Sequence, residues 1–285
     1  NTCKNLERNG FEVTYVPVEK NGIVNPKDIL KEIRKDTVLI SVMFANNEIG
    51  TLQPIVEIGK ITKENGIYFH TDAVQAVGNI KIDVNELNID LLSLSAHKLN
   101  GPKGVGALYI RKGVKIENLI HGGGQENRMR AGTENVASIV GLGKAIELAT
   151  EDIEGKAKYL TNLREKAIKS ILENIPHTII NGDRERRLPG NINVCFEYIE
   201  GESILLLLDS LGICASSGSA CTSGSLNPSH VLLAIGLPHE IAHGSLRLSF
   251  SKENTEEEVD FLLEKLPPII SRLRDMSPLY TQVKK

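Results

Sequence analysis

The stretch that decides the fold of this chain is residues 69–104, FHTDAVQAVGNIKIDVNELNIDLLSLSAHKLNGPKG. An apolar run at residues 67–69 precedes Asp72, and a second apolar run at residues 91–94 precedes Ser95-Ala96-His97-Lys98 and a Gly/Pro loop. In parallel α/β sheets, functional side chains gather at the carboxyl ends of the strands. We therefore expect two strand ends to deliver Asp72 and Lys98 to one edge of a sheet.

An acid and a lysine at such an edge suit the chemistry of pyridoxal phosphate. The lysine forms a Schiff base, and the acid keeps the pyridinium nitrogen protonated, so that the ring can accept electrons from the substrate carbon. Ser95 and His97 flank Lys98 with donors that could hold a phosphate. A single lysine is most often a solvated surface charge. The apolar strand before Lys98 and the loop at residues 101–104 after it favour the functional interpretation.

The composition is that of a globular protein and argues against several classes of partner. With 285 residues the chain can bury a large core and divide into two lobes. A net charge of −3 indicates no binding to nucleic acid. No apolar run reaches membrane-spanning length, so we expect no membrane contact. The four cysteines form no C-x-x-C pair, which predicts reduced thiols, a cytoplasmic protein and no stable metal site.

Apolar and helical patterns alternate through the first half of the chain and predict an α/β fold with a mainly parallel sheet. The run at residues 37–44 is nearly continuous, as in a strand that is covered on both faces. Asn25-Pro26 predicts a helix start, and Gly66 a helix end. The expected strands are residues 11–18, 37–44, 67–71, 91–94 and 105–110, and the expected helices are residues 25–33, 54–63 and 135–149.

We place a boundary near residue 151, which gives a large domain at residues 1–151 and a smaller α+β domain at residues 152–285. The last helix should open at Thr255 with Glu258 as its capping-box partner, and Pro267-Pro268 should interrupt or kink it. The other elements expected in the smaller domain are strands at residues 191–196, 212–216 and 245–249, and helices at residues 153–173, 202–210 and 228–235.

Residues 215–225, ASSGSACTSGS, are eleven small residues in succession, a composition typical of a mobile loop. Cys221 lies within this loop, flanked by hydroxyl groups. Free cysteines are usually buried, and we expect this of Cys195 and Cys214. An exposed cysteine on a flexible tether suits a nucleophile that must travel, which is our interpretation of Cys221.

Arg247 alternates with Leu246 and Leu248, so it should face away from the apolar side of its strand. Two interpretations remain open: an exposed arginine, or a bidentate clamp on a substrate carboxylate. The Gly-rich loop at residues 122–133 is by itself only a weak signal of phosphate binding.

Together these residues resemble the cysteine desulfurases of the NifS/IscS group, within the fold-type I pyridoxal phosphate enzymes. The resemblance spans essentially the whole chain, and the long loop that carries Cys221 is similar to the NifS/IscS type rather than the SufS type. It implies a mainly parallel sheet of the seven-stranded type, flanked by helices, and a smaller C-terminal α+β domain. Its strongest pieces are ANNEIG (45–50), HTDAVQAVG (70–78), SAHKLNGPKGVGALY (95–109), HGGGQE (121–126), RAGTEN (130–135), SSGSACTSGSL (216–226) and RLSFSKENTEEEVD (247–260).

The resemblance implies a role for each residue that matches a cofactor-binding motif. Lys98 is implied to be the Schiff-base lysine, and Asp72 the partner of the pyridinium nitrogen. Gln75 is implied to bond the ring hydroxyl oxygen. Ser95 and His97 are implied to bind the phosphate.

The resemblance also implies the groups that meet the substrate and a second subunit. Asn47 is implied to bind the cofactor and, together with Arg247, to hold the substrate carboxylate. Thr133 would reach the phosphate in the other subunit of a homodimer. Cys221 would be the persulfide carrier and a possible transient iron–sulfur ligand.

The implied activity is the conversion of L-cysteine to L-alanine. Freed Lys98 moves the Cα proton, the Cys221 thiolate attacks the substrate sulfur, and Cys221 keeps that sulfur as a persulfide. The implied acceptor is an iron–sulfur scaffold protein of the IscU/NifU type.

Two alternatives remain open. The first is another class V aminotransferase-like enzyme, such as a selenocysteine lyase or a transaminase, of which a transaminase needs no loop cysteine. The second is a sulfur-relay partner that kept the fold and lost the chemistry. The family has an opening segment, before the position of Asn1, with a phosphate loop and a ring-stacking histidine. We therefore expect this chain alone to bind pyridoxal phosphate weakly or not at all, unless a separate chain supplies that part.

Overall fold

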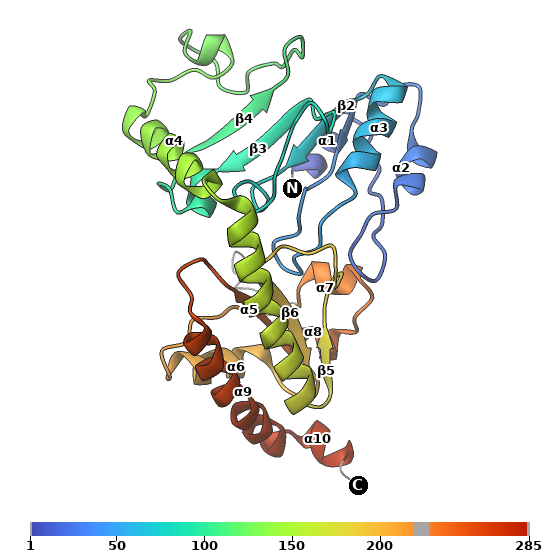
Figure 1. Cartoon of the computed structure of the whole chain (residues 1–285). Helices are drawn as coiled ribbons and strands as arrows, with labels where there is room; N and C mark the ends of the chain where they lie inside the picture. The colour runs from blue at the N-terminus through green and yellow to red at the C-terminus, as the bar shows by residue number, and fades with distance from the viewer. Residues whose placement is uncertain (1, 219–227, 284–285) are drawn as a thin grey trace.

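The computed structural model describes residues 2–218 and 228–283. These residues form two sheets, and Figure 1 shows them one above the other, with helices α4 (Val136–Thr150) and α5 (Ile153–Asn174) running past both. The predicted boundary near residue 151 falls between these two helices. It remains a prediction.

The first sheet has the strand order β1-β2-β3-β4. Strands β1 (Leu39–Ser41), β2 (Tyr68–Asp72) and β3 (Leu91–Ser95) are parallel to their neighbours, which confirms the predicted α/β fold. Strand β4 (Gly106–Ile110) is antiparallel to β3, because only a short connection separates the two. Within residues 2–218 and 228–283 this sheet has four strands, not seven.

The first half of the described chain has three helices, and local chemistry sets the start of the second and the end of the third. They are α1 (Thr2–Arg8), α2 (Pro26–Glu32) and α3 (Ile55–Asn65). The Asn25 side chain accepts a hydrogen bond from the Lys27 amide, which caps α2. Gly66 ends α3 in the left-handed conformation at φ +67°, as predicted. Phe69 of β2 packs against Ile58 of α3 in a fully buried core, so the β2 strand end is held rigidly.

The second sheet is antiparallel, with the order β5-β6-β7: β5 (Thr178–Ile180), β6 (Asn191–Phe196) and β7 (Ser245–Ser249). Every residue of β6 is buried, since α5 and α8 (His239–His243) pack on this strand. The helices α6 (Gly201–Asp209), α7 (His230–Ala234), α9 (Glu256–Met276) and α10 (Pro278–Val283) complete this part of the chain. The predicted capping box of Thr255 and Glu258 is confirmed at the start of α9.

Three strand predictions need correction. No strand forms over residues 11–17, because within the described chain only Val18 finds a bridge partner, Val24. The strand expected at residues 37–44 shrinks to β1 and is not covered on both faces, since Val38 is 67% and Leu39 46% exposed. Residues 212–216 pair only through the isolated bridge between Ser216 and Arg247.

Packing explains why α9 is not interrupted and why Cys214 is not buried as predicted. Pro267 and Pro268 do not interrupt α9, because Leu266 and Ile270 on either side are buried in one core and hold the helix together. Cys214 is exposed, since its neighbours Ile213 and Ala215 face that core. None of the helices that the structure describes combines the length and apolar character that crossing a membrane requires.

Candidate active site

The carboxyl ends of β2 and β3 form the floor of the candidate site. Asp72 is the last residue of β2 and lies in register with Ser93 of β3. Two residues later β3 ends, and the 3₁₀ helix η1 (Ala96–Leu99) carries Lys98. Both the Asp72 carboxylate and the Lys98 amine belong to exposed residues, so a small molecule can reach them. The sequence prediction that one sheet edge carries both groups is therefore met by the topology.

Ser95 and His97 lie together beside Lys98. The Ser95 hydroxyl and His97 Nδ1 are 2.6 Å apart, which places a hydroxyl and an imidazole in one small cluster. Asn100 ends the turn in the left-handed conformation at φ +59° and donates its amide to the Ala96 carbonyl. This tight turn brings the three side chains between residues 95 and 98 to the sheet edge.

Helix α4 holds the Lys98 turn in place from behind. A Cβ on Gly101 would lie 2.9 Å from the Cβ of Ala145 and 3.1 Å from that of Ala96, so only glycine permits this close approach. Gly78, just after the Asp72 turn, meets Ala149 and Leu99 in the same way. The two strand ends are therefore packed against one helix.

The loop at residues 45–50 lies next to Asp72. The β1–β2 ladder continues past β1, because the Phe44 amide donates to the Asp72 carbonyl over 2.8 Å. Asn46 then folds the loop by accepting the amides of Glu48 and Ile49 on its side-chain oxygen. Asn47 is half-buried at this turn.

Arg247 reaches the same loop from the second sheet. It lies on β7, and its Nη1 donates to the Asn47 carbonyl over 3.1 Å. The guanidinium is half-buried. The structure thus brings together two predicted substrate-binding residues that are 200 positions apart in the sequence.

The remaining predicted residues lie as follows. Gln75 is half-buried in the turn after Asp72. Thr133 is exposed in the segment between β4 and α4, which Figure 1 shows projecting from the body of the molecule. Among the described residues of a single copy of the chain, no hydrogen bond joins Thr133 to Ser95 or His97. Cys221 lies outside the described residues.

His70 is a residue of this site that sequence reasoning did not assign. Its Nδ1 lies 2.7 Å from the Ser41 hydroxyl and its Nε2 lies 2.9 Å from the Ser93 hydroxyl, so it bridges β1, β2 and β3. His70 and Asp72 share one face of β2. Burial lowers the pKa of His70, and the Asp72 charge opposes this shift. A neutral imidazole at pH 7 therefore fixes the sheet face under Asp72. The sequence signal for this cluster was the presence of the polar residues Ser41, His70 and Ser93 within three otherwise apolar strands.

Cys195 contrasts with the exposed cysteines. Cys3 and Cys214 are exposed, whereas Cys195 lies inside β6 and accepts a hydrogen bond from Asn181 Nδ2 at 3.1 Å. Burial raises the pKa of the Cys195 thiol to about 11, although the Asn181 bond acts in the opposite direction. The prediction that Cys195 is buried is confirmed.

We expect iodoacetamide at pH 7.5 to alkylate Cys3 and Cys214 in the native protein and to leave Cys195 unmodified, since the thiolate is the nucleophile. Peptide mass mapping measures this. The control is the same reaction in urea, where Cys195 should react. Native Cys195 that reacts as fast as Cys214 would contradict the assignment.

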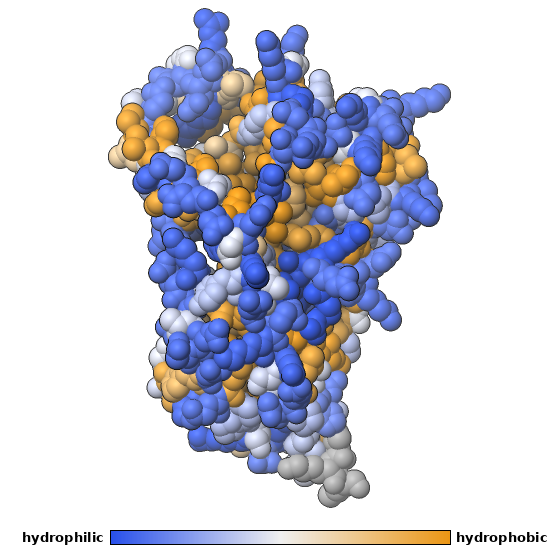
Figure 2. Space-filling model, in the orientation of Figure 1, coloured by the Kyte–Doolittle hydropathy of each residue, from blue (hydrophilic) through white to orange (hydrophobic). Residues whose placement is uncertain are grey.

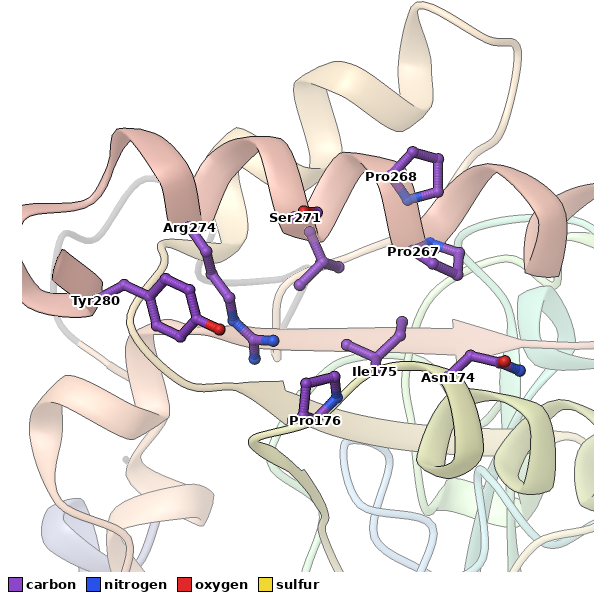
Figure 3. A pocket seen from close by; sticks show the side chains of 9 residues that line it. Asn174, Ile175, Pro176, Pro267, Pro268, Ser271, Arg274 and Tyr280 are labelled. Atoms are coloured by element: carbon purple, nitrogen blue, oxygen red, sulfur yellow. The ribbon is translucent and has the colours of Figure 1, made fainter. Parts of the chain in front are cut away.

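Two other features of the structure lie apart from this site. A cavity of about 380 Å³ lies between the end of α5, α9 and Tyr280 of α10 (Figure 3). Arg274 lines it and donates to the carbonyls of Glu197 and His177. None of the predicted site residues lines this cavity. In the part of the chain that the structure describes, no three His, Cys, Asp or Glu residues gather as metal ligands would.

Comparison with known proteins identifies the family. The family model described as aminotransferase class-V matches residues 1–262. The chain belongs to the class-V aminotransferase family. Pyridoxal phosphate is the cofactor of these class-V enzymes.

Its relatives within the class-V family are cysteine desulfurases. The protein "Cysteine desulfurase IscS" of Methanosarcina thermophila is 64% identical over 278 residues, which cover 98% of this chain and 69% of the relative. The protein of the same name from Clostridium botulinum is 60% identical over 286 residues, covering 100% and 72%. A solved structure titled "NIFS-LIKE PROTEIN" has a TM-score of 0.87 at 42% identity, covering 95% and 72%. The resemblance to the NifS/IscS group and the fold-type I architecture are thereby confirmed.

The residues at the β2 and β3 ends fit pyridoxal phosphate by their donor chemistry. Asp72 offers a carboxylate for a ring nitrogen, and Lys98 offers an amine for an aldehyde. The Ser95 and His97 pair offers donors for a phosphate. All four groups come from neighbouring ends of two parallel strands, where such ligands bind in open α/β sheets.

Proposed function

We propose that this chain is a cysteine desulfurase that converts L-cysteine to L-alanine and keeps the sulfur on Cys221 as a persulfide. The observation that carries the proposal is the placement of Asp72 and Lys98 at adjacent ends of β2 and β3. The support from similarity is the 64% identity to a cysteine desulfurase over 98% of this chain. The selenocysteine lyase, transaminase and inactive relay alternatives are not favoured by these relatives.

Five residues would hold the cofactor. Lys98 would hold it covalently, Asp72 would pair with its ring nitrogen, and Ser95 with His97 would bind its phosphate. Gln75 would bond its ring hydroxyl oxygen. When bound, the cofactor supplies an acceptor for electrons from the substrate Cα. Lys98, once the substrate has taken its place, moves the proton at that carbon.

Asn47 and Arg247 would orient the substrate through its carboxylate. The bond from Arg247 Nη1 to the Asn47 carbonyl fixes the guanidinium at the strand edge. The planar guanidinium can then donate two parallel hydrogen bonds to a carboxylate. This places the substrate between the Lys98 turn and the second sheet.

Replacing Arg247 with alanine should raise KM for L-cysteine about tenfold to a hundredfold, because each hydrogen bond to a charged group contributes about 1.5–3 kcal/mol. Arg247→Lys should recover only part of this loss, since an ammonium lacks the fork geometry. Steady-state kinetics measure both, with the exposed Arg186→Ala as the matched control. An unchanged KM in Arg247→Ala would show that this arginine is not the carboxylate clamp.

Cys221 would take the sulfur as a thiolate nucleophile. Its sulfur forms a bond to the substrate sulfur while the substrate C–S bond breaks. The electron pair of that bond stays with the substrate carbon, which takes up a proton to give alanine. The persulfide would then pass to an iron–sulfur scaffold protein of the IscU/NifU type. Such chemistry needs a free thiol and therefore a reducing compartment such as the cytoplasm.

The enzyme would act as a homodimer. Exposed apolar side chains gather where α4 begins, and Figure 2 shows apolar surface at this place, beside the projecting segment that carries Thr133. Val136 and Val140 of α4 are each 65% exposed, and Leu119 is 94% exposed. Exposed apolar surface of this kind is typical of an interface. A second copy seated here would bring Thr133 toward the phosphate site of its neighbour.

Light scattering coupled to size exclusion should therefore give twice the mass of one chain. Val140→Asp should shift this mass toward that of one chain, because a buried unpaired charge at an interface is costly. The control is Leu206→Asp, which changes an exposed leucine of α6. A single-chain mass for the unmodified protein at every concentration would rule out the homodimer.

Steady-state assays test the reaction type. The chain supplied with saturating pyridoxal phosphate, which offsets the weak binding expected from the sequence, should release sulfide and alanine from L-cysteine in the presence of a thiol reductant. Transfer of the amino group to a 2-oxo acid without sulfide release would instead identify a transaminase.

A further inference from the structure

Glu48 is a buried carboxylate to which the proposed reaction assigns no role. It lies in the loop at residues 45–50, directly after Asn47, and is only 1% exposed. Its backbone carbonyl accepts the side-chain amides of Asn191 and Asn193 of β6, each over 3.2 Å. Those two bonds fasten the loop to the second sheet whatever side chain residue 48 carries. The buried carboxylate therefore needs a separate explanation, because a carboxylate is costly to bury.

The Glu48 carboxylate is bonded to the chain that follows residues 219–227. Ser229 donates its hydroxyl hydrogen to Glu48 Oε2. The same hydroxyl caps α7, since it accepts the amides of Val231 at 3.1 Å and Leu232 at 3.3 Å. The start of α7 is thus tied to the loop at residues 45–50.

The chain that precedes residues 219–227 reaches the same carboxylate. A Cβ on Gly218 would lie 3.2 Å from Glu48 Oε2 and 3.3 Å from the Cβ of Ser229. Gly218 also has φ +46°, which favours glycine. Ser229, after the segment that contains Cys221, is therefore bonded to Glu48 Oε2, and Gly218, before that segment, leaves no room for a side chain beside the same oxygen.

Arg247 fixes the first flank to the substrate clamp. Its backbone exchanges two hydrogen bonds with Ser216, of 3.2 Å and 2.6 Å, and its Nη1 donates to the Asn47 carbonyl. A series of contacts thus leads from Arg247 to Ser216, and from there along the backbone to Gly218, which lies beside Glu48. One continuous set of contacts joins the substrate-binding pair to both flanks of the Cys221 segment.

We propose that Glu48 is a positioning residue for sulfur transfer, whose carboxylate is hydrogen-bonded to Ser229 after the Cys221 segment and lies against Gly218 before it. The inference rests on the function proposed above, because it concerns the step in which Cys221 attacks the substrate sulfur. Glu48 touches neither substrate nor cofactor. It acts by fixing Gly218 and Ser229, the described residues on either side of that segment, next to the loop that carries Asn47.

Three variants test this role in the full chain supplied with pyridoxal phosphate. Glu48→Ala and Ser229→Ala each remove one partner of the same hydrogen bond, and each should lower kcat for alanine release about tenfold to a hundredfold. KM for L-cysteine should stay within about twofold, since the clamp is left intact. Glu48→Gln keeps an oxygen that can accept the Ser229 bond, so its kcat should recover to within about threefold of the unmodified protein.

The double variant and a cap control separate positioning from stability. Glu48→Ala with Ser229→Ala should lower kcat no further than Ser229→Ala alone, because Ser229→Ala already removes the bond to Glu48 together with the α7 cap. Asp152→Ala removes the N-cap of α5, whose side chain accepts the Gly155 amide, and should lower thermal stability without lowering kcat. If Glu48→Ala does not fold, Ser229→Ala decides the question.

Hydrogen exchange gives a readout that is independent of turnover. Glu48→Ala leaves Ser229 in place, so faster exchange of the Val231 and Leu232 amides would report the loss of the anchor. Absence of alanine release by the unmodified protein would refute the proposed function. Full activity in the unmodified protein together with unchanged kcat in Ser229→Ala and Glu48→Ala would refute the positioning role alone. If Glu48→Ala raised KM for L-cysteine by the same factor by which it lowered kcat, the positioning role would also be refuted.

Discussion

Lys98→Ala should lower the rate of alanine formation from L-cysteine about a thousandfold or more, even at saturating pyridoxal phosphate, because one side chain both holds the cofactor and moves the substrate proton. The visible absorption of the bound cofactor should be lost with it. Lys98 is exposed at the end of β3, so its replacement by alanine removes no core packing. Unfolding in urea should therefore be nearly unchanged.

The matched control is Lys103→Ala, an exposed lysine five residues further along the same loop. It should keep both the absorption and the activity. Lys98→Ala protein that still turns over L-cysteine at more than a few per cent of the original rate would show that another residue moves the proton.

Cys221→Ala is the second variant with a large expected effect. It should abolish sulfur transfer and lower alanine formation about a hundredfold or more, because the thiol that we propose to attack the substrate sulfur is then missing. The visible absorption of the cofactor should persist, since Lys98 and Asp72 are untouched. A spectrum recorded alongside the activity assay measures both.

Cys214→Ala serves as the control, because Cys214 is an exposed cysteine in the same part of the chain. It should retain full activity. Alanine formation that survives in Cys221→Ala and fails in Cys214→Ala would move the nucleophile to Cys214. Survival in both variants would favour a transaminase-like reaction that needs no thiol.

The sequence predicted the β2 and β3 edge well, because strong local signals coincide there. Apolar runs end at chemically distinctive residues, Asp72 and the Ser95–Lys98 cluster, and the strand that carries Arg247 was also predicted correctly. Parallel neighbours place their carboxyl ends together, so the pattern implied the juxtaposition.

What the sequence did not predict depends on tertiary contacts between distant segments. Glu48 looks like an ordinary acid in a polar loop, and only the fold shows that Ser229, 181 positions later, bonds it. Cys214 was expected to be buried, but the alternation of Ile213 and Ala215 turns it outward. The prolines of α9 were expected to interrupt or kink the helix; it is not interrupted, because their buried neighbours hold it together.

The most direct test of the proposed desulfurase is a single turnover without a sulfur acceptor. The chain loaded with pyridoxal phosphate is mixed with L-cysteine. The alanine formed is quantified, and the mass of the peptide that contains Cys221 is measured by mass spectrometry. The account predicts one alanine per active site and the mass of one added sulfur atom on Cys221. Alanine without added sulfur on Cys221, or added sulfur on another cysteine, would contradict it.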